Sequence, residues 1–507
     1  MKSNMRNLLI LGLVLLFAAC TDLEETLNED LTEAEANEFF NESADVSSLL
    51  QSAYFGLRGF QSQEFFWALQ EHTSDEVIPP TRGPDWDDNG VWRVLHDHTW
   101  PADNIRFEDT FNQLLQNVFA TTNILTFNVN AQQAAEARFI RAFTMLALVD
   151  GWGKVPFREP GDNLLEAPRV LTGAEAVEFI ISEVEDVLPN LPADGPAFRA
   201  NQDAARVLLM KAYLNKGAFA NRENPVFDQT DMNQVISLAD EIINSGKYSL
   251  AENYFDNFAP NNDAISTENI FTGENQGGAN SGNVRSRWMC TLHYNQNPSG
   301  WNGFATIADL YNKFDQDDPR LNSSYPGVTD VSGIRVGLLE GQQFDADGNP
   351  LEDRRGNPLD FSVDVALTET GNNLEVTGVR VVKYPIDYSN TENADNDYVF
   401  YRYADVLLMK AEAQLRNGNA GEALTIVNDI RTQRGVEAFT ELTEDNLLDE
   451  RARELYWEGH RRQDLIRFGK FLDPWTAKQA SGPERLLFPI PPTALAVNPN
   501  LSQNPGY

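Results

Sequence analysis

A six-residue sequence that occurs twice constrains the fold of this chain more than any other feature. Val-Leu-Leu-Met-Lys-Ala stands at residues 207–212 and again at 406–411. Each copy opens a stretch with helical periodicity that ends near a glycine, Gly217 or Gly418, and a second helical stretch with small residues follows. Alanine and glycine allow paired helices to pack closely, so the sequence predicts two similar helix pairs.

Apolar residues recur at three- and four-residue steps along most of the chain outside its middle. In one such stretch Phe139, Phe143 and Leu146 fall on a single helical face. Gly217 and Gly246 stand where glycine commonly ends a helix. We predict a mainly α fold, a degenerate array of tetratricopeptide-like helix pairs, with amphipathic helices at 45–57, 107–127, 133–149, 173–188, 202–216, 231–245, 404–417, 421–434 and 446–468.

The middle of the chain, from about 247 to 400, has a different character. It is rich in Asn, Gly and Asp, and short alternating runs at 334–338, 361–367 and 374–381 are separated by turn sequences such as Asp-Gly-Asn-Pro. This predicts loops and small β-hairpins inserted into a helical domain. The predicted parts are a signal at 1–19, a helical part at 20–246, the insertion at 247–400 and a helical part at 401–507 that completes the same domain.

The N-terminus has the pattern of a bacterial lipoprotein signal. Lys2 and Arg6 precede an apolar run too short to span a bilayer, and small residues at 18 and 19 lead directly to Cys20. Cleavage before Cys20 and acylation of its thiol would anchor the chain to a membrane. Phe17 stands where leucine is usual in such signals, and the alternative is an ordinary secretory signal with an incidental cysteine.

The net charge argues against nucleic acid as a partner, and the cysteine content argues against a disulfide-stabilised fold. The chain carries 76 acidic and 39 basic residues, a net charge of −37, and such a field repels nucleic acid. Only two cysteines are present, so with Cys20 acylated Cys290 has no partner and no disulfide framework supports the fold. A chain of this length can bury a large core without such links.

Three motifs distributed along the chain resemble those of the SusD/RagB family. Residues 136–143 and 148–157 resemble its Arg-x-x-Arg-Ala helix and Trp-Gly-x-Val-Pro loop. Residues 450–465 resemble its Glu-Arg-x-x-Glu-Leu…Glu-Gly-x-Arg…Asp-Leu helix, and 488–507 resembles its C-terminal tail. The acidic residues at 22, 24 and 25 resemble a surface-export signal of Bacteroidetes lipoproteins.

The resemblance implies a lipoprotein of the outer membrane that faces the cell exterior. It implies capture of an oligosaccharide or polysaccharide for a SusC-like TonB-dependent transporter, without catalysis and without a cofactor. A β-glucan such as laminarin is our expected ligand. A RagB-like binder of peptides or another nutrient, and a surface glycoside hydrolase, remain as alternatives of other classes.

Two loop clusters have the side chains that bind sugars, because pyranose faces stack on aromatic rings and hydroxyls pair with amides, carboxylates and guanidiniums. One cluster spans 82–89, near Trp92 and Trp100; the other spans 287–304. Core packing is an equal alternative for any single tryptophan there, and Trp152 and Trp457 are predicted to be structural. The candidate ligand-binding residues are Trp86, Trp301, Trp288, Tyr294, Asp85, Arg82 and Asn302, with Trp86 and Trp301 foremost.

Catalytic and metal motifs are weak in this sequence. His96 and His98 flank Asp97 without a further histidine or cysteine at ligand spacing, so a solvated or hydrogen-bonded loop pair is favoured over a metal site. Residues 345–350 imitate the start of a calcium loop, but Pro350 follows Asn349 and a hairpin turn fits better. His460 is predicted to be a structural hydrogen-bond donor. We predict neither a metal nor enzymatic activity.

Overall fold

The structure is a computed structural model, and it describes residues 44–83, 85–278 and 282–507. The chain divides into two units, Met1–Asp45 and Val46–Tyr507, and the described helices and strands belong to the second. The predicted signal at 1–19, Cys20 and the acidic residues after it lie outside the described residues.

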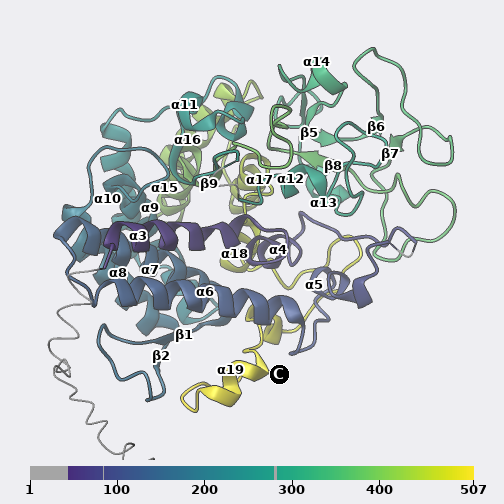
Figure 1. The fold of residues 1–507 in the computed structure, drawn as a ribbon. Coiled ribbons are helices and arrows are strands. Elements are labelled where there is room, and N and C mark those ends of the chain that lie inside the picture. The colour runs from purple at the N-terminus through teal and green to yellow at the C-terminus, as the bar shows by residue number, and fades with distance from the viewer. Residues whose placement is uncertain (1–43, 84, 279–281) are drawn as a thin grey trace, which may run out of the picture. The chain divides into compact units, whose positions relative to one another are not determined.

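The first half of the second unit is mostly helical (Figure 1). Its helices are α3 (Val46–Gly56), η1 (Leu57–Gln61), α4 (Phe66–Glu71), η2 (Asp88–Gly90), α5 (Arg93–His96), α6 (Ile105–Ile124), α7 (Ala131–Trp152), α8 (Gly173–Val187), η3 (Leu188–Asn190), α9 (Gln202–Ala220) and α10 (Gln229–Asn244). From α6 to α10 each helix packs against the next one in sequence, as expected of helix pairs. The capping box of α7, in which Asn130 and Gln133 exchange hydrogen bonds, fixes where that helix begins.

The C-terminal part returns to the same helices. It contains α15 (Tyr403–Arg416), α16 (Ala420–Gln433), α17 (Glu444–Leu455), α18 (Arg461–Arg467), η5 (Pro483–Leu486) and α19 (Pro492–Val497). The two copies of the six-residue repeat lie in α9 and α15, which pack against each other and both contact α10. Lys211 of the first copy donates a buried 2.7 Å hydrogen bond to Asp405, directly before the second. The predicted mainly α fold with paired helices is confirmed.

The predicted helices differ from the structure in two places: one helix continues beyond its predicted end, and another is divided in two. Gly217 lies inside α9, which continues to Ala220. Close packing explains why glycine stands at 217, because a Cβ there would lie 1.9 Å from the carbonyl oxygen of Val226. The single helix predicted at 446–468 is two helices, since Trp457 and Gly459 adopt positive φ angles of 60° and 82° and turn the chain between α17 and α18.

Short strands and helices make up the middle region. Its elements are η4 (Tyr254–Phe258), α11 (Asn262–Ile265), β3 (Asn269–Gly273), α12 (Ser286–Met289), α13 (Ala308–Tyr311), β4 (Asn322–Ser323), α14 (Thr329–Ser332), β5 (Val336–Leu339), β6 (Gly341–Gln342), β7 (Asp360–Phe361), β8 (Arg380–Val382) and β9 (Tyr398–Arg402). β3 pairs antiparallel with β9, so the two ends of the region are joined. β5 pairs with both β4 and β8, and β6 with β7. A separate hairpin, β1 (Lys154–Phe157) and β2 (Arg169–Thr172), follows α7.

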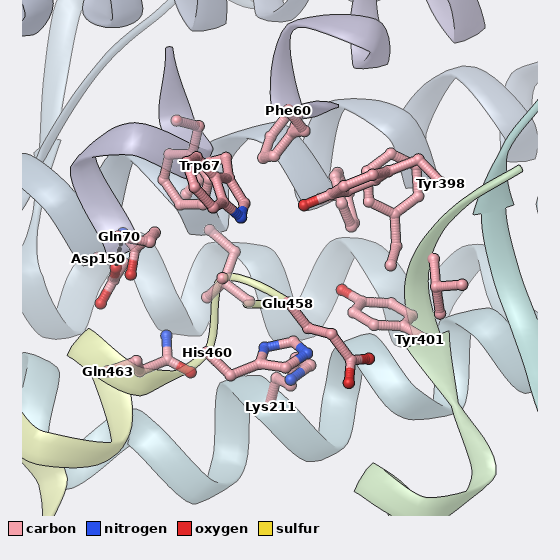
Figure 2. A pocket seen from close by; sticks show the side chains of 17 residues that line it. Phe60, Trp67, Gln70, Asp150, Lys211, Tyr398, Tyr401, Glu458, His460 and Gln463 are labelled. Carbon is pink, nitrogen blue, oxygen red and sulfur yellow. Dashed lines mark hydrogen bonds between the residues drawn. The ribbon is translucent and has the colours of Figure 1, made fainter. Parts of the chain in front are cut away.

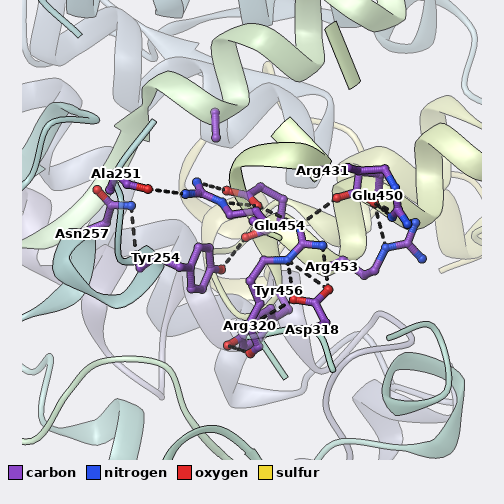
Figure 3. A network of polar contacts seen from close by, with 12 residues as sticks. Ala251, Tyr254, Asn257, Asp318, Arg320, Arg431, Glu450, Arg453, Glu454 and Tyr456 are labelled. Atoms are coloured by element: carbon purple, nitrogen blue, oxygen red, sulfur yellow. Dashed lines mark hydrogen bonds and ion pairs between the residues drawn. The ribbon is translucent and has the colours of Figure 1, made fainter. Parts of the chain in front are cut away.

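A buried ionic network fastens this middle region to the helices. Glu454 of α17 accepts hydrogen bonds from Arg320, Arg402 and Arg434, which come from a loop, from the end of β9 and from the end of α16. Figure 3 shows Glu454 and Arg320 of this network. Burial by itself would raise the pKa of Glu454, but the three guanidiniums outweigh it and hold that pKa well below its usual range. Glu450, one helical turn earlier, likewise accepts from Arg320.

Two further observations concern membrane-spanning helices and the thiol of Cys290. No helix within the described ranges has both the length and the apolar character needed to cross a bilayer. Cys290 is a buried free thiol, and burial raises its pKa to about 12, which makes it unreactive at neutral pH.

Candidate functional site

The structure brings the two predicted loop clusters together on one surface. The indole Nε1 of Trp86 donates a 2.8 Å hydrogen bond to the carbonyl oxygen of Trp301, 215 residues away in sequence. The hydroxyl of Tyr294 donates to Asp85 Oδ2 at 3.1 Å. Asp85 is exposed, and the three rings are partly exposed. These four residues, here named the Trp86–Trp301 surface, combine aromatic rings with a carboxylate.

Trp86 has a strained backbone conformation, which its surroundings hold in place. Trp86 has a φ of 61°, in the left-handed region that bulky residues rarely adopt. The side chain is held there by packing: a Cβ added to Gly303 would lie 2.3 Å from the indole, and the ring of Phe304 lies 4.9 Å away. Such strain costs about 1–3 kcal/mol and is typical of sites whose surroundings impose a geometry.

Three of the predicted ligand-binding residues do not reach this surface. Trp288 and Asn302 are fully buried, and Arg82 is 3% exposed. Burial therefore corrects their predicted role from ligand contact to support. The guanidinium of Arg82 donates to the carbonyl oxygens of Asn302 and Leu374, which ties the loop before Trp86 to the loop after Trp301.

The surface also contains residues that sequence reasoning missed. The guanidinium of Arg354 lies 3.9 Å from the centre of the Tyr294 ring and forms a 2.6 Å ion pair with Glu375. His293 lies 2.9 Å from the other oxygen of Glu375. Burial would raise the pKa of Glu375, but the hydrogen bonds from His293 and Arg354 hold it below its usual value. No local motif marks Arg354 or Glu375, because only the folded chain places them beside Tyr294.

A separate cavity lies between α4 and α9 (Figure 2). Its volume is about 90 Å³, and aromatic rings including Phe60, Trp67 and Tyr401 form much of its wall. An engineered cavity of about 150 Å³ binds benzene, so the smaller space here fits a few waters.

His460 lies on the polar side of that cavity, facing Lys211 (Figure 2). Burial and then the neighbouring Lys211 lower the pKa of His460 to about 4, so the ring is neutral at physiological pH. Its predicted role as a structural hydrogen-bond donor stays a prediction, because the ring faces the cavity and burial only fixes its neutral state.

The remaining histidines and tryptophans of interest lie in the core. The ring nitrogens of His96 lie 2.9 and 2.8 Å from backbone carbonyl oxygens, and those of His98 contact Ser481 and a backbone carbonyl. This is the hydrogen-bonded arrangement favoured for the pair. Trp152 and Trp457 are buried. Among residues 44–83, 85–278 and 282–507, no group of three histidine, cysteine or acidic side chains is arranged to hold a metal ion.

Comparison with known proteins gives a family from the sequence and the same type of fold from solved structures. The sequence model of the SusD family matches residues 238–507. The starch-binding protein SusD of Bacteroides thetaiotaomicron is 28% identical over 497 residues, covering 89% of this chain and 85% of that protein.

Solved structures of low sequence identity share the fold. A SusD superfamily protein of Parabacteroides distasonis superposes with a TM-score of 0.71 at 20% identity, covering 94% of this chain and all of that one. A laminarin-binding SusD-like protein gives 0.68 at 19% identity, covering 91% and 99%. With a family model that spans more than half of its length, the chain belongs to the SusD family, as its motifs predict.

Proposed function

We propose that this SusD-family protein captures an oligosaccharide or polysaccharide on the Trp86–Trp301 surface and passes it, chemically unchanged, to a SusC-like TonB-dependent transporter. The observation that carries the proposal is the meeting of Trp86, Tyr294 and Trp301, from loops distant in sequence, as partly exposed rings beside an exposed carboxylate. Aromatic faces and planar polar groups are the two kinds of partner that sugars need.

Two relatives suggest which glycans to test. The 28%-identical relative is named for starch, and one structural neighbour is named for laminarin. Starch and laminarin are both uncharged glucans. We propose an uncharged glucan as the ligand, with the β-glucan laminarin as the first choice. A RagB-like role in binding peptides or another nutrient is the second candidate, because one fold supports several ligands.

One carboxylate beside this surface, Glu375, lacks the character of a catalytic acid. A glycosidase needs a general acid whose pKa is raised, so that it stays protonated near neutral pH. Glu375 has the opposite character, because its hydrogen bonds lower its pKa. The strongly raised carboxyl pKa of Glu76 belongs to a side chain that is 1% exposed and accepts a hydrogen bond from the backbone of Trp457. Relatives named for binding fit a role without catalysis.

A glycan panel tests the proposed function directly. We expect isothermal titration calorimetry to detect binding of laminarin or starch oligosaccharides, and we expect no new reducing ends after prolonged incubation. Release of reducing ends would overturn the binding-only role. Binding of peptides by a protein that binds none of the glycans would favour the second candidate.

We further propose that Cys20 carries a lipid that tethers the protein to the outer membrane, facing outward beside its transporter. The signal pattern before Cys20 and the family membership support this. An affinity-tagged chain solubilised from membranes is expected to co-purify a TonB-dependent transporter. A Cys20→Ser variant is expected to leave the membrane fraction. A wild-type protein that fractionates as soluble, or purifies without such a partner, would contradict the proposal.

A further inference from the structure

An eight-residue unit is repeated in tandem beside the Trp86–Trp301 surface. Residues 345–352 read Asp-Ala-Asp-Gly-Asn-Pro-Leu-Glu, and 353–360 read Asp-Arg-Arg-Gly-Asn-Pro-Leu-Asp. The aspartate, glycine, asparagine, proline and leucine keep their positions in both copies. The second and third positions differ most in character, with Ala346 and Asp347 in one copy and Arg354 and Arg355 in the other.

Both copies fold into the same turn. The carboxylate of the leading aspartate, Asp345 or Asp353, accepts hydrogen bonds from the backbone N–H groups two and four residues later, at 2.8–2.9 Å. The glycine of each turn has a φ of 81°. The hairpin turn predicted at 345–350 is present, and Phe344 pairs antiparallel with Pro350 across it. Because the constant residues make the turn, its second and third residues are free to serve another purpose.

The second turn reaches the Trp86–Trp301 surface. Asn295, next to Tyr294, donates a 2.8 Å hydrogen bond to the carbonyl oxygen of Glu352, and the backbone N–H of Arg354 donates to Glu375 at 3.2 Å. These contacts fix the direction in which the turn presents the Arg354 side chain.

Arg354 is placed to contact a ligand. Its side chain is 47% exposed, and its guanidinium covers one face of the Tyr294 ring at 3.9 Å. Nε and Nη2 pair with Glu375, and Nη2 lies 3.8 Å from Asp85. Nη1 has no partner within the described ranges. An exposed, ordered guanidinium edge with a free N–H group can donate to hydroxyls of a bound molecule.

We propose that Arg354 is a specificity-determining residue, which donates hydrogen bonds from Nη1 to the hydroxyls of an uncharged glycan stacked on the adjacent rings. The inference rests on the proposed function of the Trp86–Trp301 surface and names a further residue and a ligand class for it. The tandem repeat is the device that presents the arginine, since the same turn carries alanine at the equivalent position, Ala346.

The charges around Arg354 select against anionic glycans. Its positive charge is already opposed by Asp85 and Glu375. A uronic acid or sulfate group brought to Arg354 would meet these carboxylates at short range, where like charges repel. The hydroxyls of a neutral glycan meet no such penalty.

A calorimetric titration of four proteins with three ligands tests the inference. The proteins are wild type, Arg354→Ala, Arg335→Ala and Trp301→Ala. Each is titrated with laminariheptaose, maltoheptaose and a polygalacturonate oligosaccharide. Arg335→Ala is the matched control, because it removes an exposed arginine that contacts Asn322 and Ser324 instead of this surface. We expect Arg354→Ala to weaken binding of the neutral glycan about tenfold, the loss of a charge-assisted hydrogen bond, while Arg335→Ala leaves it unchanged. Wild type is expected not to bind the polyanion.

The possible outcomes separate this inference from the proposed function. If Trp301→Ala loses binding while Arg354→Ala keeps wild-type affinity, the surface stands and the role of Arg354 is overturned. Strong binding of the polyanion by wild type overturns the ligand class. If wild type binds no glycan, both proposals fail. Equal thermal melting of Arg354→Ala and wild type excludes unfolding as the cause of a loss, and Arg354→Lys supplies a second variant that keeps the charge.

Discussion

Replacing Glu454 by alanine is expected to lower the free energy of unfolding by about 3–5 kcal/mol, the usual cost of removing one member of a buried ionic group. The Glu454 carboxylate accepts hydrogen bonds from Arg320, Arg402 and Arg434 at 2.7–2.8 Å. All four side chains are at most 2% exposed. Without the carboxylate, each of three buried guanidiniums would lose one of the acidic partners that offset its desolvation. Urea unfolding followed by circular dichroism measures the loss.

A surface glutamate provides the control for this prediction. Glu241 of α10 forms a 2.7 Å ion pair with Arg206 but is 53% exposed, so Glu241→Ala is expected to cost less than about 1 kcal/mol. Glu454→Gln, which keeps the shape and removes the charge, is expected to fall between the two. Equal unfolding midpoints for Glu454→Ala and Glu241→Ala would show that the network does not hold the middle region to the helices.

Replacing Trp301 by alanine is expected to weaken glycan binding by about thirtyfold or more, as truncation of a central aromatic at a binding site commonly does. The indole is partly exposed, so the loss of stability is small. Trp86→Ala is expected to weaken binding similarly but also to cost stability, because that indole packs against Gly303 and Phe304. Calorimetric titration with the best glycan of the panel measures both effects.

An exposed aromatic outside the site separates stacking from a general effect of removing a ring. Phe119 on α6 is 50% exposed and lies among different residues, so Phe119→Ala should bind the glycan as wild type does. Unchanged affinity in both Trp86→Ala and Trp301→Ala would mean that the glycan binds elsewhere on the molecule.

Helices were the most predictable part of the fold, because their periodicity is local. Gly217 shows the limit of that reasoning: glycine suggests a helix end, but here it allows the approach of Val226 from a following loop. The turn at Trp457 was equally hidden, since a tryptophan in the left-handed region is favoured by nothing local. Its backbone N–H is held by Glu76, 381 residues away.

The sequence allowed the residue types of the candidate site to be predicted, but not how their side chains are arranged in space. Gly, Pro, Asn and Asp around Trp86 and Trp301 mark exposed loops, and both rings are partly exposed. Trp288, which follows Arg287 in the second loop cluster, was also a candidate but is buried, because α12 turns it toward the core. Arg354 and Glu375 could not be assigned, since their relation to Tyr294 depends on how the middle region folds back on itself.

The most direct test of the account is a crystal structure of the protein with the glycan that binds best in the panel. We expect sugar rings stacked on Trp86 or Trp301, with hydroxyls within hydrogen-bond distance of Arg354 and Asp85, and an intact glycosidic chain. Sugar bound away from these residues, or a chain cleaved at the site, would contradict it.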